Sequence, residues 1–299
     1  MSARFRRRVF GGFLVGLVCL PAFAAGASRL ARRDGPTTTR LLCSAHATQA
    51  AAVDEKHMYA ISNTTVAQYE RMSGRLVRLA TTADTRHLNS GFVWEGRVWS
   101  AHSNYPATPH ASDVRVFDPA SGTLTVQHVF PDPPGSLVWC VVKDGRWWCC
   151  FAHYGSDNHR TVLVEYEAGG FSRERGRWHF PAEVVADWDG MSASGGLWDG
   201  DTLLVSHHHF RVLYRLRLPT EGTTLQFIEA LHAPFPGQGI AADPITGGFV
   251  GIDRQRRAVV FASACPSAGG GEPRRQERRI VVEDRAGAAA GCDDRPHGL

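Results

Sequence analysis

The sequence lacks the features that mark several common classes of protein. Its 299 residues have a formal net charge of only +4, and residues 1–24 hold four arginines and no acid, which leaves 4 − 4 = 0 for the rest. A neutral chain gives no electrostatic argument for binding nucleic acid. After residue 24, no apolar run is long enough to span a membrane.

Other catalytic and structural signatures are also absent. The cysteines after residue 24 do not follow the spacing of a zinc ribbon, and no G-x-S-x-G motif is present. No long segment has the apolar periodicity of an amphipathic helix. These absences argue against a zinc-ribbon protein, an α/β-type serine hydrolase and a helical bundle.

The first 24 residues have the layout of a signal peptide. A basic head precedes a short apolar stretch, and Ala22-Phe23-Ala24 fits a small-residue cleavage site. We therefore expect export to the periplasm or the extracellular space, by the general secretory route or, because Arg7-Arg8 resembles its signal, the twin-arginine route. Behind this leader we expect a flexible segment at 25–40, a single domain at 41–285 and a disordered tail at 286–299.

The domain is built from five copies of one unit. The copies start near residues 46, 87, 134, 192 and 236, and each contains short apolar strands separated by turns. The second strands, for example, read HMYAIS, RVWSAH, WCCFAH, TLLVSH and GFVGID. Four short strands repeated at this period predict an all-β fold, a five-bladed β-propeller with four antiparallel strands per blade. A six-bladed propeller is the alternative, if two copies have been merged.

The third copy contains a candidate disulfide. In CVVKDGRWWC, Asp144-Gly145 is a two-residue hairpin turn, and counting outward from it places Cys140 opposite Cys149. The alternation makes this a non-hydrogen-bonded pair, the closer kind, in which a bridge fits. Buried free thiols are the alternative.

Stacking the copies aligns two columns of polar residues. The second strands end in Ser62, His102, His153, His207 and Asp253, and the first strands open with Gln49, Ser90, Ser136, Ser194 and Gln238. In an antiparallel hairpin the start of the first strand lies beside the end of the second. Both columns are therefore predicted to ring the same mouth of the central channel.

The histidines of this ring leave three interpretations open. His102, His153 and His207, with Asp253, are suitable ligands for one divalent metal ion. The same three histidines are candidate acid–base catalysts, because imidazole titrates near physiological pH. The third interpretation is structural, with each histidine capping its strand.

Further residues near these strand ends are predicted to bind substrate. Polar and aromatic groups flank the columns, and an arginine follows Asp253, where it could hold an anion. The predicted substrate-binding residues are His87, Asn89, Asn104, Tyr105, Tyr154, Gln238 and Arg254.

The blade pattern resembles the exported bacterial propellers of the YVTN, NHL and SMP-30/gluconolactonase group. Turns such as VFDPASGTL and the strand GQGIAADP carry the resemblance, which spans residues 41 to about 285. Members of the SMP-30 group bind a divalent metal at the channel mouth through Glu, Asn and Asp and hydrolyse lactones, whereas this sequence offers mainly His.

We therefore expect a monomeric, exported enzyme that acts on a small molecule or carbohydrate at the channel mouth. Lactone hydrolysis, lyase chemistry and isomerisation are the reactions that the histidines suggest. A non-catalytic ligand-binding or scaffold propeller is the alternative function.

Overall fold

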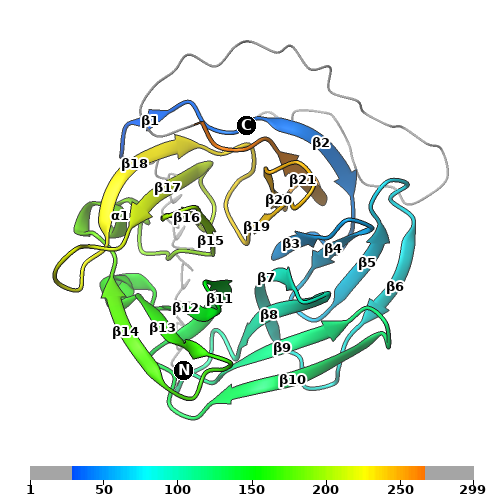
Figure 1. The fold of residues 1–299 in the computed structure, drawn as a ribbon, viewed down its shortest axis with the longest axis horizontal. Coiled ribbons are helices and arrows are strands. Elements are labelled where there is room, and N and C mark those ends of the chain that lie inside the picture. The colour runs from blue at the N-terminus through cyan, green and yellow to red at the C-terminus, as the bar shows by residue number, and fades with distance from the viewer. Residues whose placement is uncertain (1–28, 267–299) are drawn as a thin grey trace, which may run out of the picture.

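Five antiparallel sheets surround a central axis in the computed structural model, which describes residues 29–266 (Figure 1). The predicted five-bladed β-propeller is thereby confirmed. The expected signal peptide, residues 1–24, and the expected tail, residues 286–299, lie outside the described residues. No helix in the described part is long and apolar enough to cross a membrane.

Each blade places its strands in order from the axis outward. The innermost strands are β3 (Ala50–Val53), β7 (His87–Trp94), β11 (Ser136–Lys143), β15 (Gly195–Asp199) and β19 (Ala241–Ala242). The second strands are β4 (His57–Ile61), β8 (Arg97–Ser103), β12 (Arg146–Ala152), β16 (Thr202–Ser206) and β20 (Phe249–Asp253). Figure 1 shows the five innermost strands close to the axis.

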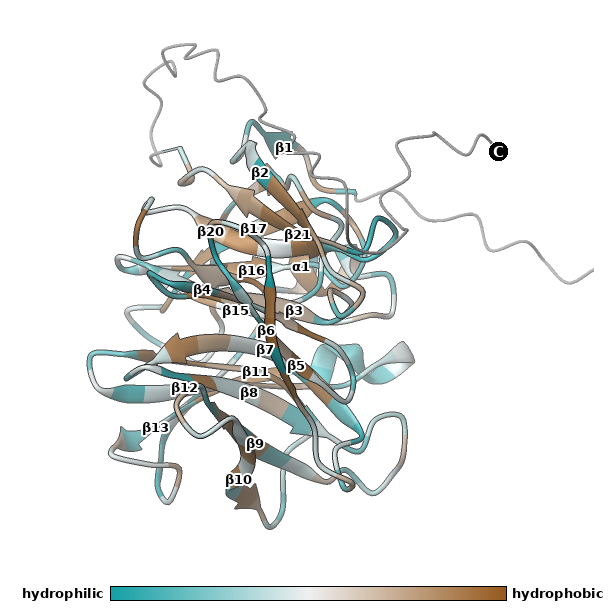
Figure 2. Ribbon diagram, turned by 90° about the vertical axis from the view of Figure 1, so that its right-hand side faces the viewer, coloured by the Kyte–Doolittle hydropathy of each residue, from teal (hydrophilic) through white to brown (hydrophobic). Residues whose placement is uncertain are grey.

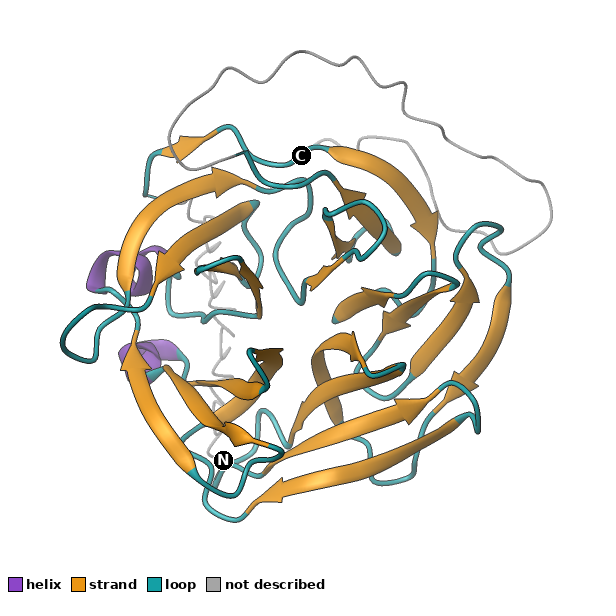
Figure 3. Cartoon of the chain, in the orientation of Figure 1, coloured by secondary structure: helices purple, strands orange, loops and turns teal. Residues whose placement is uncertain are grey.

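The outer half of each blade has the same layout. The third strands are β5 (Val66–Glu70), β9 (Ser112–Asp118), β13 (Val162–Ala168), β17 (Val212–Arg217) and β21 (Ala258–Ala262). The outermost strands are β6 (Leu76–Ala80), β10 (Thr123–Phe130), β14 (Glu174–His179), β18 (Gln226–His232) and β2 (Thr38–Cys43). A 3₁₀ helix, η1 (Gly155–Arg160), and a short helix, α1 (Ala182–Asp187), lie on the side of blades 3 and 4 (Figure 3).

The N-terminal segment closes the ring. Strand β2 pairs with β21 and so provides the outermost strand of blade 5, while β1 (Arg32–Arg33) adds a short parallel strand to β18. Within the segment 25–40, which was expected to be flexible, residues 32–33 form β1 and residues 38–40 begin β2. Because the first and last parts of the chain share one sheet, the propeller cannot open without breaking the β2–β21 pairing.

Apolar side chains fill the spaces between neighbouring blades, and Figure 2 shows the apolar strands running through the stacked sheets. The innermost strands crowd at the axis, where glycine allows close approach. A Cβ at Gly196 would lie 2.6 Å from Trp139, which is fully buried in the core between blades 3 and 4. Trp139 therefore packs the core and does not offer its ring to a ligand.

The hairpin predicted in blade 3 has the expected register, with Cys140 opposite Cys149. Asp144 and Gly145 have φ values of 52° and 73°, as a two-residue turn with left-handed residues requires. Both cysteines are nevertheless free thiols, so the structure contains no 140–149 disulfide. They are buried in the apolar core between blades 2 and 3, where the alternative interpretation placed them.

Candidate site at the channel mouth

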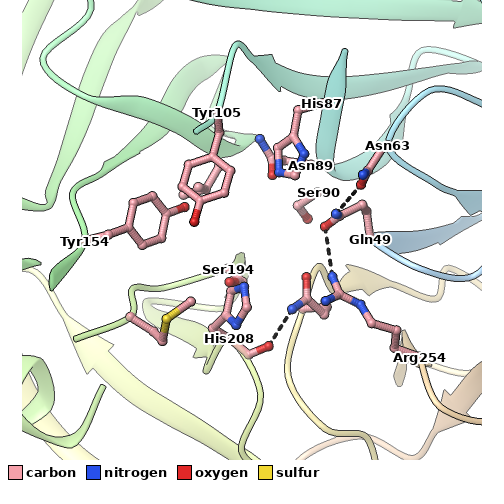
Figure 4. Close-up of a pocket in the computed structure, with 13 residues that line it drawn as sticks. Gln49, Asn63, His87, Asn89, Ser90, Tyr105, Tyr154, Ser194, His208 and Arg254 are labelled. Carbon is pink, nitrogen blue, oxygen red and sulfur yellow. Dashed lines mark hydrogen bonds between the residues drawn. The ribbon is translucent and has the colours of Figure 1, made fainter. Parts of the chain in front are cut away.

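A cavity of about 310 Å³ opens at the end of the channel where the first strands begin and the second strands end (Figure 4). This volume suits a small ligand. Most of the lining is polar: Gln49, Asn63, His87, Asn89, Ser90, Tyr105, Val138, Tyr154, Met191, Ser194, His208, Gln238 and Arg254.

The structure brings six of the seven predicted substrate-binding residues together in this cavity: His87, Asn89, Tyr105, Tyr154, Gln238 and Arg254. Asn104 is not among the residues that line the cavity. Its amide nitrogen donates to the Pro109 carbonyl at 2.9 Å, and its amide oxygen accepts from the Ala111 N–H at 2.9 Å. Asn104 therefore braces the loop between β8 and β9.

The predicted catalytic column does not reach the cavity. Side chains alternate between the two faces of a strand, so moving by one residue turns a side chain from one direction to the other. None of the five aligned strand-end residues lines the cavity, whereas the residue that follows them does so in most blades. In four blades this next residue lines the cavity: Asn63, Tyr154, His208 and Arg254.

His102 and His153 hold the segments that lead into their own blades. His102 Nε2 accepts the Arg86 N–H at 2.9 Å, so its Nδ1–H donates to the Asp113 carboxylate at 2.7 Å. His153 Nε2–H donates to the Pro134 carbonyl at 2.7 Å. These two histidines take the structural role that was the third interpretation of the column.

His207 and Asp253 also stabilise loops. The fully buried His207 accepts the His209 and Phe210 N–H groups at Nδ1, at 3.0 and 2.9 Å, and its ring stacks on Phe210 with centroids 4.3 Å apart. Asp253 accepts from Arg211 of blade 4 at 3.2 Å and caps the turn by accepting the Arg256 N–H at 3.1 Å.

These four residues do not form a metal site. Among residues 29–266, no group of three or more His, Cys, Asp or Glu side chains is arranged to hold a metal ion. Their hydrogen bonds instead hold each of the four side chains among the loops and strands around its own strand end. A divalent metal elsewhere on the protein stays a prediction.

Arg254 provides the positive charge of the mouth. Its Nε donates to the Thr48 carbonyl at 2.8 Å and its Nη2 to the Gln49 amide oxygen at 3.4 Å, which leaves Nη1 without a hydrogen bond to any described residue. Burial, and then the neighbouring charge of Arg257, lowers the pKa of Arg254. No Asp or Glu lines the cavity, and no carboxylate among residues 29–266 pairs with this guanidinium. An arginine in this setting is suited to a ligand carboxylate.

Two neutral histidines face the same cavity. The pKa of His208 is lowered to about 4, first by burial and then by the charges of Arg254, His209 and His87. The pKa of His87 is also lowered, first by burial and then by His102 and Arg254. Both rings are therefore uncharged at neutral pH and can accept a proton.

Aromatic rings form one wall of the cavity. Tyr105 and Tyr154 lie with their ring centroids 4.8 Å apart, and the His87 ring is 5.3 Å from Tyr105. Figure 4 shows both phenol oxygens directed toward the open centre, and neither makes a hydrogen bond to a described residue. Burial raises the pKa of Tyr154, which keeps this phenol protonated and able to donate.

Amide side chains hold the remaining walls in place. The Asn89 amide donates to the Leu137 carbonyl at 2.8 Å, and Gln238 donates to the backbone carbonyl of His208. Gln238 has a φ of 71°, in the left-handed region that glycine favours. A long polar side chain at a strained backbone position beside the cavity suggests a functional role for Gln238.

Three lining residues were not anticipated from the sequence: Asn63, Val138 and Met191. Gln49, Ser90 and Ser194 belonged to the first-strand column but were not predicted to bind substrate, and His208 was not among the predicted site residues. Counting one residue further along each second strand would have identified Asn63 and His208.

Comparisons with known proteins agree with the fold. No family model and no curated protein matches the sequence. The structure is similar to glutaminyl cyclase from Myxococcus xanthus, with a TM-score of 0.54 and 10% identity over 79% of this chain and 100% of that one. It is also similar to a glucose dehydrogenase (TM-score 0.45, 11% identity, 78% of this chain and 99% of that one).

At these identities the likeness shows the fold alone. The comparisons therefore support a β-propeller, and they do not establish membership in the YVTN, NHL and SMP-30 group.

Proposed function

We propose that the protein is an enzyme that binds a small molecule bearing a carboxylate, such as a sugar acid, and transfers a proton at the carbon next to that carboxylate. The observation that carries the proposal is Arg254, a guanidinium without a carboxylate partner among residues 29–266, in a cavity lined by two neutral histidines. Elimination by a lyase and epimerisation by an isomerase at this carbon both begin with this proton transfer.

In the proposed reaction, Arg254 binds the carboxylate and stabilises the negative charge that develops on it. The neutral imidazole of His208 accepts the proton from the adjacent carbon. In an elimination, the released electron pair forms a double bond, the neighbouring carbon–oxygen bond breaks, and a phenol of the Tyr105–Tyr154 pair protonates the leaving oxygen. Hydrolysis by a pair of carboxylates is not proposed, because no Asp or Glu among residues 29–266 lines the cavity.

The binding step is tested by calorimetry with glucuronate, galacturonate and mannuronate, each compared with its neutral parent sugar. We expect Arg254→Gln to weaken binding of the acid about ten- to a hundredfold, because a hydrogen bond to a charged group contributes roughly 1.5–3 kcal/mol. Arg97→Gln is the matched control, since Arg97 is an exposed arginine that does not line the cavity. Equal affinities of the Arg254→Gln variant and the wild type for the acid would refute the proposed role of Arg254.

The catalytic step is tested with His208→Gln and with the ultraviolet absorbance of an unsaturated product. We expect the variant to bind the sugar acid and to lose turnover. If the wild-type protein binds the acid and turns over none of its derivatives, the non-catalytic ligand-binding function is the correct one.

A further inference from the structure

A second hollow of about 530 Å³ adjoins the channel mouth on the side of blades 1 and 5. It shares Gln49, Asn63 and Arg254 with the mouth cavity, so these three residues form the boundary between the two spaces. A ligand larger than the mouth cavity would therefore extend into this hollow.

The boundary is built from linked polar groups. Arg254 donates to Gln49, and the Gln49 amide donates to Asn63, as the dashed lines in Figure 4 show. The backbone carbonyl of Thr48 fixes Arg254 from the side of the hollow. The guanidinium is thus held where groups on either side of the boundary can reach it.

A second arginine, Arg257, lies in this hollow. Its Nη1 donates to the Ala45 carbonyl at 3.0 Å, and the Arg257 carbonyl accepts the Ser44 N–H at 2.7 Å, which fixes the segment that carries it. Arg257 pairs with no carboxylate among residues 29–266, and no Asp or Glu lines the hollow. Two arginines that repel each other therefore lie at adjoining positions, and no carboxylate among residues 29–266 neutralises either charge. This arrangement favours an anionic ligand.

The remaining lining indicates what kind of anion fits. Hydroxyl groups come from Thr48, Ser62, Thr64 and Thr65, and Ala45 is the one apolar residue that lines the hollow within residues 29–266. Such a surface offers many hydrogen-bonding groups and little apolar area, so it suits a sugar ring, which carries hydroxyl groups on most of its carbons, better than a peptide, which carries few.

We propose that this hollow binds a second acidic sugar unit, with Arg257 holding its carboxylate, so that the substrate is an acidic oligosaccharide of at least two units. The inference rests on the proposed function, because the first unit occupies the mouth cavity beside Arg254. Beyond the proposed function, it gives the substrate a minimum length of two sugar units and makes Arg257 a second residue that determines specificity.

Calorimetry with a hexuronate, its homodimer and the corresponding neutral disaccharide tests this inference on the full chain. We expect the acidic dimer to bind at least tenfold more tightly than the monomer. Arg257→Asn should remove this gain and leave the monomer affinity unchanged, whereas Arg254→Gln should weaken both ligands. Asparagine is chosen because Arg257 has a φ of 52°, which asparagine tolerates.

Arg257→Lys keeps the charge without the planar fork and should recover part of the gain, which separates ligand binding from a folding defect. If the dimer and monomer bind equally well and Arg257→Asn changes neither affinity, the second unit is not bound here, although the proposed function stands. If wild-type protein binds neither acid, the proposed function itself fails.

Discussion

Replacing His102 with alanine should destabilise the protein without impairing ligand binding. The ring bridges the Arg86 N–H and the Asp113 carboxylate in a buried setting, where water cannot replace it fully. The bond to the carboxylate contributes roughly 1.5–3 kcal/mol, and the unpaired N–H costs about 1 kcal/mol more. Asp113 keeps its bond to Arg115 at 3.0 Å, which limits the damage. We expect a loss of about 2–4 kcal/mol.

For a domain of this size, that loss corresponds to a melting temperature lower by about 5–15 °C. His102→Asn should recover about half of it, because its amide nitrogen can take the place of Nδ1 and donate to Asp113. His232→Ala, at an exposed histidine on β18, is the control and should melt like the wild type.

Melting and turnover measurements on His208→Ala should give the opposite pattern, with a stability change within about 1 kcal/mol and a loss of turnover of the sugar acid. If His102→Ala melts at the wild-type temperature and loses ligand binding, the assignment of His102 to the framework and of His208 to the site is wrong.

Two further predictions follow from buried groups. Burial and, after it, neighbouring charges lower the pKa of His207 to about 3 and that of His208 to about 4, well below the usual value of a histidine. Between pH 6.5 and 4 the unfolded chain therefore binds protons that the folded protein does not. The stability of the fold should fall as the pH is lowered through that window. In urea titrations, His208→Gln should reduce this slope by about 1 kcal/mol per pH unit, and an unchanged slope would contradict the low pKa. Burial raises the pKa of Cys140 to about 12 and those of Cys149 and Cys150 well above their usual range, so a thiol reagent should modify none of the three before unfolding and all three afterwards. Peptide mapping that finds Cys140 bridged to Cys149 would refute this.

The fold could be predicted because a propeller blade is a local unit. Each meander contains its own strands and turns, so the copies could be aligned without any long-range information. The closure of the ring is different. The sequence that follows the last copy, CPSAGGGEPRR, does not predict a strand, and the outer strand of this blade is Thr38–Cys43, more than 200 residues earlier. A pairing between the two ends of a chain has no local signal.

The site was predicted less well because side chains of one strand alternate between two directions. The repeat places His102 and His153 at equivalent strand ends, but it does not say whether their side chains face the channel or turn away from it. An error of one residue exchanges the two. Asn104 could not be assigned correctly for another reason: its two bonds to the Pro109 carbonyl and Ala111 N–H depend on the path of an irregular loop.

Repetition itself favours structural residues over functional ones. Every blade must secure its strand end and the loops around it, so equivalent positions recruit residues that form hydrogen bonds, as at His102, His153 and Asp253. A small ligand at the axis breaks the fivefold symmetry, because each blade meets a different part of it. The channel-facing positions are correspondingly dissimilar: Asn63, Tyr154, His208 and Arg254 share no chemistry. In a propeller, the column that differs from blade to blade is therefore the better place to look for the site.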